Sequence, residues 1–389
     1  MDSYKILFAL RILKNILTSF IDSFLVLYFF NVSDKNILPL GIYKLVAVTA
    51  IYGAVFLTRN FAKSRCRISL LRMGILLDLL YFCTIIFLKD KIIDYIYMAG
   101  LLYGLEEGVY YSVYNMIESD EISNEDRAGF TGSFTAVQAV LSIVFPVVFG
   151  SLMYANGFIK SLAVVLAIVL IRIILSLYLK PKYIPKGRKT NIKEYLKLTK
   201  GSFIFGQLYR TEFLYGLIYT EGAFGYIVTI YIIKVFSDSF SLGIFTSVFS
   251  FITCVIGILF ARFMGKKHYE PTIRISIIMT VIALCIMICD CRALTIILFN
   301  LFYTISKSIV ILINENIQAN LSNNAGIRNE YKVEYWLANE TCFFVARIVS
   351  NGIFILMAVW NVNVIMAVFM IFLLLLSREL SKLNRMMKS

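Results

Sequence analysis

Long apolar runs, each close to the width of a bilayer, constrain the fold of this chain more than any other feature. The runs recur along almost all of its 389 residues, of which 59% are hydrophobic and 16% are charged. A transmembrane helix needs about 20 apolar residues, whereas the strands of a membrane barrel alternate over about 10. The sequence therefore predicts an all-α membrane protein without a sizeable soluble domain.

The apolar runs predict twelve transmembrane helices in two sets of six, separated by a polar, basic segment. We expect residues 1–180 to form an N-terminal six-helix bundle, 181–200 a cytoplasmic linker and 201–389 a C-terminal six-helix bundle. The expected helices are Leu7–Phe30, Ile37–Leu57, Ile68–Leu88, Ile93–Ile117, Ala128–Tyr154, Phe158–Leu179, Phe213–Ile233, Phe240–Phe263, Ile273–Ile288, Leu294–Ile317, Tyr335–Trp360 and Val362–Leu376.

The distribution of lysine and arginine predicts the orientation of these helices. Most of the 38 basic residues fall on one side of the expected membrane, together with both termini and the linker. Lys14 is placed there too, at the cytoplasmic end of the first helix. Because basic loops stay in the cytoplasm, we expect a multi-pass protein of the cell membrane with both termini inside. The net charge of +14 is then explained by this bias and by anionic headgroups, and nucleic acid is not expected as a partner.

The sequence lacks the side chains on which most enzymes and metal sites depend. His268 is the only histidine, and the seven cysteines are scattered without the spacing of metal ligands. It has no Gly-x-x-x-x-Gly-Lys-Ser/Thr motif for nucleotide phosphates. We therefore expect no enzyme activity, no cofactor and no bound metal.

The two halves of the chain share polar positions, which indicates an internal repeat. A shift of 199 positions superposes Arg11 on Arg210 and Asp22 on Glu221. These matches place base on base and acid on acid in the expected first and seventh helices. They favour two homologous six-helix halves.

Two local motifs carry a resemblance to a known family. They are the run Asn124–Gly129 followed by Gly132, Phe145–Pro146 and Gly150, and the run Glu334–Tyr335 followed by Glu340 and Ala346–Arg347. Together with the repeat of six helices, they resemble the major facilitator superfamily of secondary transporters, and the second motif is similar to its Gram-positive bacterial members. The resemblance implies alternating access through a cavity lined by the first, fourth, seventh and tenth helices.

The loop between the second and third helices departs from that family's pattern. Phe61–Arg67 keeps the basic residues but lacks the family's glycine and aspartate, whereas Phe260–Lys267 in the second half keeps Gly265. This departure puts in question the gating salt bridge attributed to that aspartate. The gating-loop residues that the resemblance implies are Lys63, Arg65, Arg67, Arg127, Lys266 and Lys267.

Ionisable side chains inside the expected helices are the candidate site residues. A charge at the centre of a transmembrane helix costs about 2.5–3.5 kcal/mol, so each needs a partner or a water-filled cavity. Asp78 and Arg172 lie in helices expected to be peripheral, and we assign them to structure. We place the substrate and ion pathway at Asp22, Glu106, Glu107, Glu221, Lys307, Arg11, Arg210, Gln138, Glu340 and Arg347.

Glu106 and Glu107 are the expected proton carriers. Two adjacent carboxylates in a low dielectric cannot both ionise cheaply, so one of them can hold a proton. In the alternative interpretation, each glutamate balances a buried base such as Lys307 or Arg347.

The symmetric pairs also have two interpretations each. Asp22 and Glu221 favour a role at the cavity, and the alternative is a satisfied polar position beside a neighbouring helix. Arg11 and Arg210 either line the pathway or anchor helix ends at the cytoplasmic headgroups.

The sequence favours a secondary carrier driven by protons or by another coupling ion. We expect a monomer that contacts membrane lipids and moves a small or amphiphilic molecule, and the resemblance includes exporters of drugs and peptides. The alternative is a protein of the same fold that no longer transports and serves as a receptor, an immunity protein or an assembly partner.

Overall fold

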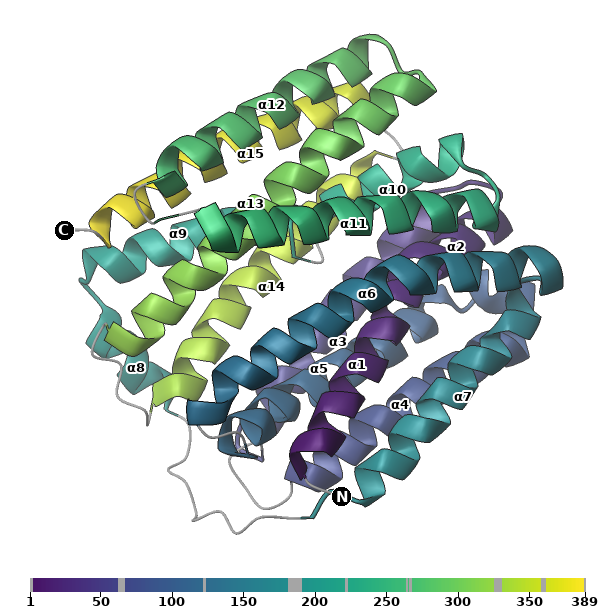
Figure 1. Ribbon diagram of the computed structural model, residues 1–389, viewed down its shortest axis with the longest axis horizontal. Coiled ribbons are helices and arrows are strands. Elements are labelled where there is room, and N and C mark those ends of the chain that lie inside the picture. Colours follow the sequence, from purple (N-terminus) through teal and green to yellow (C-terminus); the bar gives the residue numbers. More distant parts are fainter. Residues whose placement is uncertain are drawn as a thin grey trace. The chain divides into compact units, whose positions relative to one another are not determined.

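The computed structural model describes residues 3–61, 67–121, 124–180, 191–220, 223–263, 265, 268–324, 331–357 and 362–387. All regular secondary structure in these residues is helical (Figure 1). The all-α prediction is therefore confirmed for the described part of the chain. Nine of the described helices are long and apolar enough to cross a membrane. The predicted total of twelve stays a prediction.

The chain divides into two compact units, which we describe separately. The first unit is Met1–Lys189 with Phe236–Val248, and the second is Thr190–Val235 with Phe249–Ser389. The segment around the start of α11 (Ser239–Phe263) belongs to the first unit because it packs closely on α6 (Asn124–Asn156). At this crossing Gly150 and Gly243 lie side by side, and the Ser239 hydroxyl donates to the Gly150 carbonyl at 3.2 Å.

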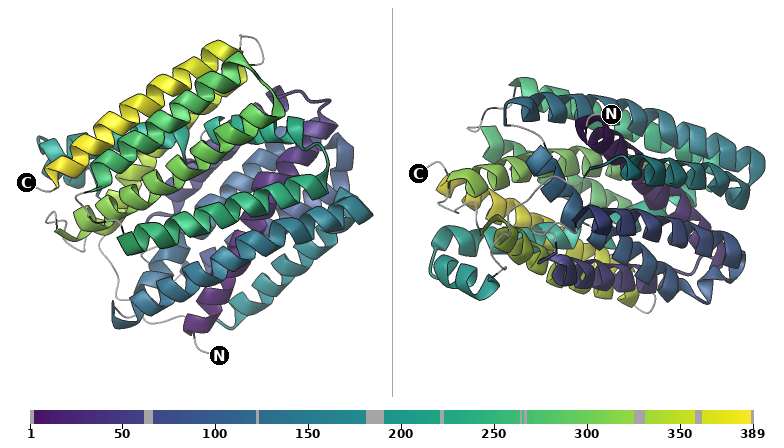
Figure 2. Two further views of the ribbon diagram at one scale, coloured as in Figure 1. Left: turned by 45° about the horizontal axis from the view of Figure 1, so that its top comes forward. Right: turned by 90° about the horizontal axis from the view of Figure 1, so that it is seen from below.

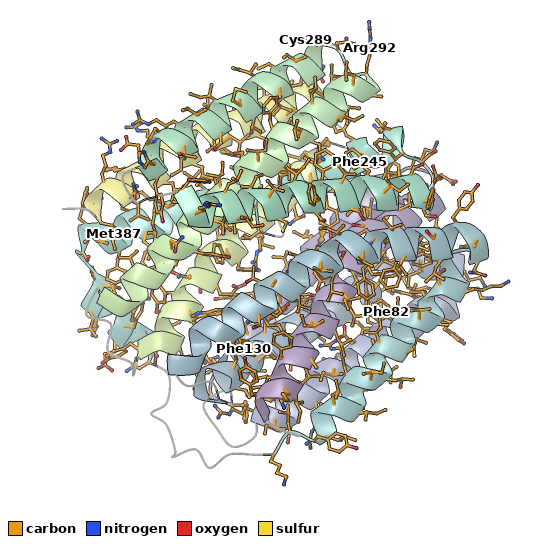
Figure 3. The ribbon with its side chains drawn as sticks, viewed as in Figure 1. Phe82, Phe130, Phe245, Cys289, Arg292 and Met387 are labelled. Carbon is orange, nitrogen blue, oxygen red and sulfur yellow. The ribbon has the colours of Figure 1, made fainter. Side chains whose placement is uncertain are left out.

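The first unit contains most of the helices before the central linker. They are α1 (Ser3–Phe20), a π-helical turn (Ile21–Leu25), α2 (Val26–Val32), α3 (Leu38–Thr58), α4 (Arg67–Leu88), a 3-10 turn (Lys89–Ile93), α5 (Ile96–Glu121), α6 and α7 (Phe158–Leu177). Phe130, labelled in Figure 3, lies where α6 contacts α1. The centre of its ring is 5.0 Å from that of Tyr4 and 5.6 Å from that of Phe8.

The second unit contains the remaining helices. They are α8 (Ile192–Thr199), α9 (Phe203–Ile218), α10 (Ala223–Val235), α12 (Tyr269–Cys289), α13 (Ala293–Asn324), α14 (Lys332–Leu356) and α15 (Val362–Met386). Figures 1 and 2 show α12 beside α15, and the two helices are in contact.

Several expected helices have different boundaries in the structure: the predicted ends at Ile317 and Leu376 fall short of the ends of α13 at Asn324 and of α15 at Met386, and the first and seventh helices differ more. The predicted first helix, Leu7–Phe30, is interrupted by the π-helical turn that contains Asp22. The predicted seventh helix, Phe213–Ile233, is wrong at its start, because α9 already begins at Phe203 and ends at Ile218. The polar residues in the first half of α9 hid its length, since hydropathy alone marks only the apolar part.

Glycines set a very close approach of α3 and α5. Gly100, Gly104 and Gly108 recur every four residues on one face of α5. A Cβ added at Gly100 or Gly108 would stand 2.5 or 2.6 Å from a carbonyl oxygen of α3, and one at Gly104 would be closer still. Such small-residue stripes allow transmembrane helices to pack backbone to backbone. This contact fixes the rotation of the helix that carries Glu106 and Glu107.

We expect Gly104→Ala to destabilise the protein by about 1–3 kcal/mol, because the added methyl group must push α3 and α5 apart. Thermal unfolding of the detergent-purified protein would measure the effect. Gly53→Ala on α3 is the matched control, since a Cβ there meets no atom within 4 Å. Equal melting temperatures for the two variants would contradict the close packing.

Candidate ion-coupling site

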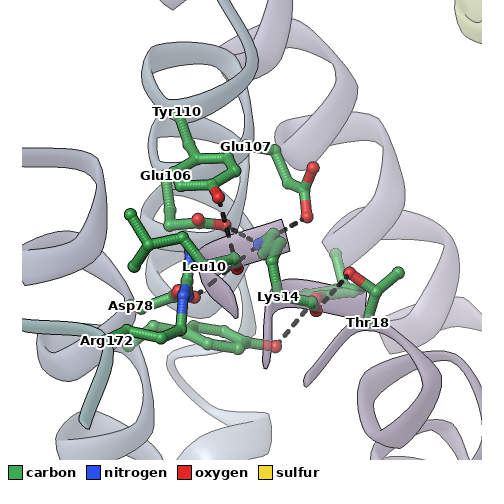
Figure 4. Close-up of polar contacts among 10 residues, drawn as sticks. Leu10, Lys14, Thr18, Asp78, Glu106, Glu107, Tyr110 and Arg172 are labelled. Carbon is green, nitrogen blue, oxygen red and sulfur yellow. Dashed lines mark hydrogen bonds and ion pairs between the residues drawn. The ribbon is translucent and has the colours of Figure 1, made fainter. Parts of the chain in front are cut away.

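Lys14 is fully buried in the middle of α1 and faces three carboxyl groups (Figure 4). Its ammonium group forms ion pairs with Glu106 and, at 2.8 Å, with Glu107, both on α5. A carboxyl oxygen of Asp78, on α4, lies 3.8 Å away. Lys14, which the sequence analysis counted only among the basic residues of the cytoplasmic side, is thus a buried side chain on the face of α1 that turns toward the acidic residues of α4 and α5.

Arg172 completes this group of charges from α7. It is fully buried and forms an ion pair with Asp78. The guanidinium carbon also lies 4.8 Å from the centre of the Tyr110 ring, and the Lys14 nitrogen lies 5.8 Å from the same ring. We call Lys14, Asp78, Glu106, Glu107 and Arg172 the Lys14 cluster.

Helical spacing explains why these side chains meet. Glu106, Tyr110 and Tyr114 follow one another at intervals of four on α5 and therefore share one face. The Tyr114 hydroxyl donates to the Leu7 carbonyl at 2.9 Å, so this face is fastened to α1. Gly74 lets α4 approach the backbone of Tyr110 closely, which brings Asp78 to the same depth.

The charges of the Lys14 cluster do not cancel when every group is ionised. Three carboxylates oppose one ammonium and one guanidinium group, which leaves one negative charge in excess. An unbalanced charge is costly in a low dielectric, whereas one added proton removes it. The cluster is therefore neutral with one proton bound and carries one negative charge after it releases that proton.

Asp22 and Gln138, both predicted site residues, line one pocket in the first unit. The pocket has a volume of about 230 Å³ and lies between α1 and α6. Its wall also includes hydroxyl, amide and apolar side chains, namely Ile12, Asn15, Ile16, Thr18, Ser19, Leu141, Ser142 and Phe145. The structure thus brings together two residues from opposite parts of the first half of the sequence.

Arg11 lies near the Lys14 cluster but has its own partner. Its guanidinium group donates to both carboxyl oxygens of Glu118 at 2.9 Å and stacks over Phe134 at 4.0 Å. Because Nη1 makes both contacts, this is an ion pair between α1 and α5 through a single guanidinium nitrogen, in a partly exposed position.

Among the described residues of the second unit, two predicted residues meet in an ion pair. Glu340 and Arg347 pair with each other along α14 at 2.6 Å, and Arg347 also donates to the carbonyl of Thr220 at 3.1 Å. Lys307 is half-buried on α13, and Arg210 is exposed on α9. Neither Lys307 nor Arg347 is the base that meets Glu106, since that base is Lys14.

Glu212 is a buried acid that the sequence analysis missed. It is fully buried on α9, between the exposed Arg210 and the residue at which the helix was predicted to begin. The amide of Asn314 donates to its Oε1 at 3.1 Å, and Gln318 donates to the same oxygen. The sequence alone could not identify Glu212 as buried, because its partners lie about 100 positions away on α13 and meet it only once α9 and α13 are folded.

Several predicted positions fall outside the described residues or their side chains. Glu221, Lys63, Arg65, Lys266 and Lys267 lie outside the described ranges, and the side chain of Arg127 does too. Arg67 is described, and it is buried at the first residue of α4.

A family comparison decides the identity of the fold. The model of the Major Facilitator Superfamily matches residues 40–350, which is most of the chain. The chain belongs to the Major Facilitator Superfamily. Membership in this superfamily of transporters confirms the predicted family and agrees with the expectation that the protein is not an enzyme.

Individual relatives are distant. A protein of Geobacillus stearothermophilus described as an uncharacterized protein in the sodM 3'region is 26% identical over 153 residues, which cover 38% of this chain and 70% of the relative. The crystal structure of a mutant of the nucleoside transporter NupG aligns with 98% of this chain and over 100% of the NupG chain, with 13% sequence identity and a TM-score of 0.71. The crystal structure of the human organic anion transporter MFSD10 aligns with 97% of this chain and 98% of the MFSD10 chain, with 11% sequence identity and a TM-score of 0.65. These likenesses show the fold of a superfamily transporter.

We expect Asp78→Leu and Arg172→Leu each to destabilise the protein by about 3–5 kcal/mol, because each leaves a buried charge without its partner. The double variant should lose less than the sum, with a coupling energy of about 0.5–3 kcal/mol. Unfolding of the purified protein would measure all three variants.

The exposed pair Glu270 and Arg274, four residues apart on α12, serves as the control cycle. Its coupling should be at most about 0.5 kcal/mol. A strictly additive result for Asp78 and Arg172 would contradict the buried ion pair.

Proposed function

We propose that this protein is a secondary active transporter that works by alternating access and is coupled to protons through the Lys14 cluster. The observation that carries the proposal is the burial of three carboxyl groups against two bases inside the helices of a superfamily transporter. Binding of one proton balances the cluster, and its release restores the excess negative charge. A carrier needs such a group, because the coupling ion must enter the low-dielectric interior without a large energetic cost.

Glu107 is the proposed entry point for the proton. Its side chain is 12% exposed, whereas those of Glu106 and Lys14 are 1% exposed. A proton taken up by Glu107 weakens its ion pair with Lys14, and the ammonium group can then pair fully with Glu106. Protonation thus changes the contacts that join α1 to α5, the helices that also hold the Arg11–Glu118 pair.

The pocket between α1 and α6 supports a small amphiphilic substrate. Its wall combines the carboxyl group of Asp22 and the amide of Gln138 with apolar groups such as Phe145. The polar groups suit one hydrogen-bonding part of a molecule and the apolar groups suit another. Export of a drug or a peptide is the direction that we propose on the resemblance to bacterial exporters.

The remaining parts of the proposal concern the membrane context. We place the protein in the cell membrane, as a monomer with twelve transmembrane helices in two six-helix bundles and with cytoplasmic termini, on the basis of its loop charges. The second candidate is a non-transporting receptor, immunity or assembly protein, favoured by the loss of the glycine and aspartate in the loop Phe61–Arg67. Retention of buried charges favours transport, because a scaffold would be more stable without them.

Transport assays in proteoliposomes test the proposal. A panel of amphiphilic drugs and peptides is applied to proteoliposomes that contain a pH-sensitive dye. A compound counts as a substrate when it causes a proton flux that is absent from liposomes without the protein. We expect Glu107→Gln to abolish uphill transport and to preserve exchange of substrate at equal concentrations, because its cluster is balanced without a proton. Glu270→Gln, at the exposed pair on α12, is the control and should transport normally.

Two outcomes would count against the proposal. Normal uphill transport by Glu107→Gln, Glu106→Gln and Asp22→Asn would remove the Lys14 cluster and the pocket from the mechanism. A folded wild-type protein that moves no compound of the panel, and no proton, would favour the non-transporting alternative.

A further inference from the structure

Glu212 lies in a polar network in the second unit that is separate from the Lys14 cluster. Its Oε1 accepts hydrogen bonds from the side-chain amides of Asn314 and Gln318, both on α13. The Oε1 of Gln318 in turn accepts from the Tyr335 hydroxyl and from the Asn339 amide at 3.3 Å, both on α14. The network therefore joins α9, α13 and α14.

The atoms left without a partner in this network are all acceptors. Among the described residues, Oε2 of Glu212, Oδ1 of Asn314 and Oδ1 of Asn339 are buried and have no hydrogen-bond partner. Buried polar atoms nearly always have one, and each that does not costs about 1–3 kcal/mol. Each amide nitrogen of the network already donates at least one hydrogen bond, whereas these three oxygens accept none.

No basic side chain in the described part of the chain forms an ion pair with Glu212. Arg210, two residues earlier on α9, points to another side of the helix and is exposed. Arg347 on α14 is paired with Glu340. An ionised Glu212 would therefore be a buried charge without a counter-charge, which a low dielectric penalises heavily.

The other described groups that interact electrostatically with Glu212 are tyrosines and a cysteine. Tyr335 and Cys342 of α14 lie close enough to interact with it electrostatically, and so does Tyr215 of its own helix. Tyrosine and cysteine are neutral acids near pH 7, so they cannot compensate a carboxylate. The amides of α13 supply partial charges only.

We infer that Glu212 is a proton-binding site of the second unit and holds its proton on Oε2 as a neutral carboxylic acid. The proton turns Oε2 from an acceptor without a partner into a donor. It also removes the uncompensated charge. A metal cation fits less well, because the amide N–H groups of Asn314 and Gln318 already point at the carboxyl group.

Infrared spectroscopy of the purified full-length protein tests this inference without a transport substrate. At pH 7 the difference spectrum of the wild type minus Glu212→Gln should contain the C=O stretching band of a protonated carboxylic acid, whereas a proton held by the Lys14 cluster contributes equally to both spectra and cancels. Asn314→Ala, which keeps the acid but removes one donor to Oε1, should shift the band. Glu379→Gln is the matched control, because Glu379 is a partly buried acid of the second unit that accepts a hydrogen bond from Gln207. It should leave the band in place.

Thermal unfolding gives a second, independent readout. The side-chain amide introduced by Glu212→Gln is uncharged and can donate a hydrogen bond from the position of the protonated Oε2. The melting temperature of this variant at pH 7 should therefore equal or exceed that of the wild type. Raising the pH should lower the melting temperature of the wild type more than that of the variant, because only the wild type gains a buried charge on ionisation.

Three results would overturn the inference. The first is a band of equal intensity in the wild type and in Glu212→Gln, and the second is a band that is absent from the wild type and from Asn314→Ala. The third is a melting temperature that rises with Na⁺ at constant ionic strength in the wild type only, which would assign the site to a metal cation. Because the difference between wild type and variant separates Glu212 from a proton held by the Lys14 cluster, and because no measurement involves transport, the inference can fail while the proposed function stands, and the reverse also holds.

Discussion

The ion pairs of Lys14 with Glu106 and Glu107 are the contacts on which the first unit depends. Inside a bilayer, a lysine on α1 is tolerated only where carboxylates meet it, so α4 and α5 must present theirs at the same depth. The glycine stripe of α5 serves this requirement, because it seats the helix on α3 in a fixed rotation. Backbone packing and charge compensation are thus two aspects of one arrangement.

The two units solve the same physical problem in different ways. The first compensates buried acids with an ammonium and a guanidinium group, whereas the second surrounds Glu212 with amides and hydroxyls. The shift of 199 positions that aligns Arg11 with Arg210 places Lys14 on Phe213, so the predicted repeat does not extend to this chemistry.

Hydropathy and helical spacing predicted part of the fold and of the candidate site. The all-α class and the importance of Glu106 and Glu107 follow from residue types along the chain, because a bilayer admits charges only at special positions, whereas the family was predicted from a resemblance of motifs. Lys14 was counted with the cytoplasmic basic residues because a cation near a helix end usually belongs to the adjoining loop. Glu212 was missed because polar neighbours concealed the first half of α9.

The sequence by itself determined that this chain is a helical membrane protein and which of its side chains are costly to bury. That outcome is local, since the length and polarity of each run decide whether it can enter a bilayer. Only the tertiary structure decided which charge meets which. A partner such as Arg172 lies 94 positions from Asp78, and their contact depends on the rotation and depth of two packed helices, which no single run of residues specifies.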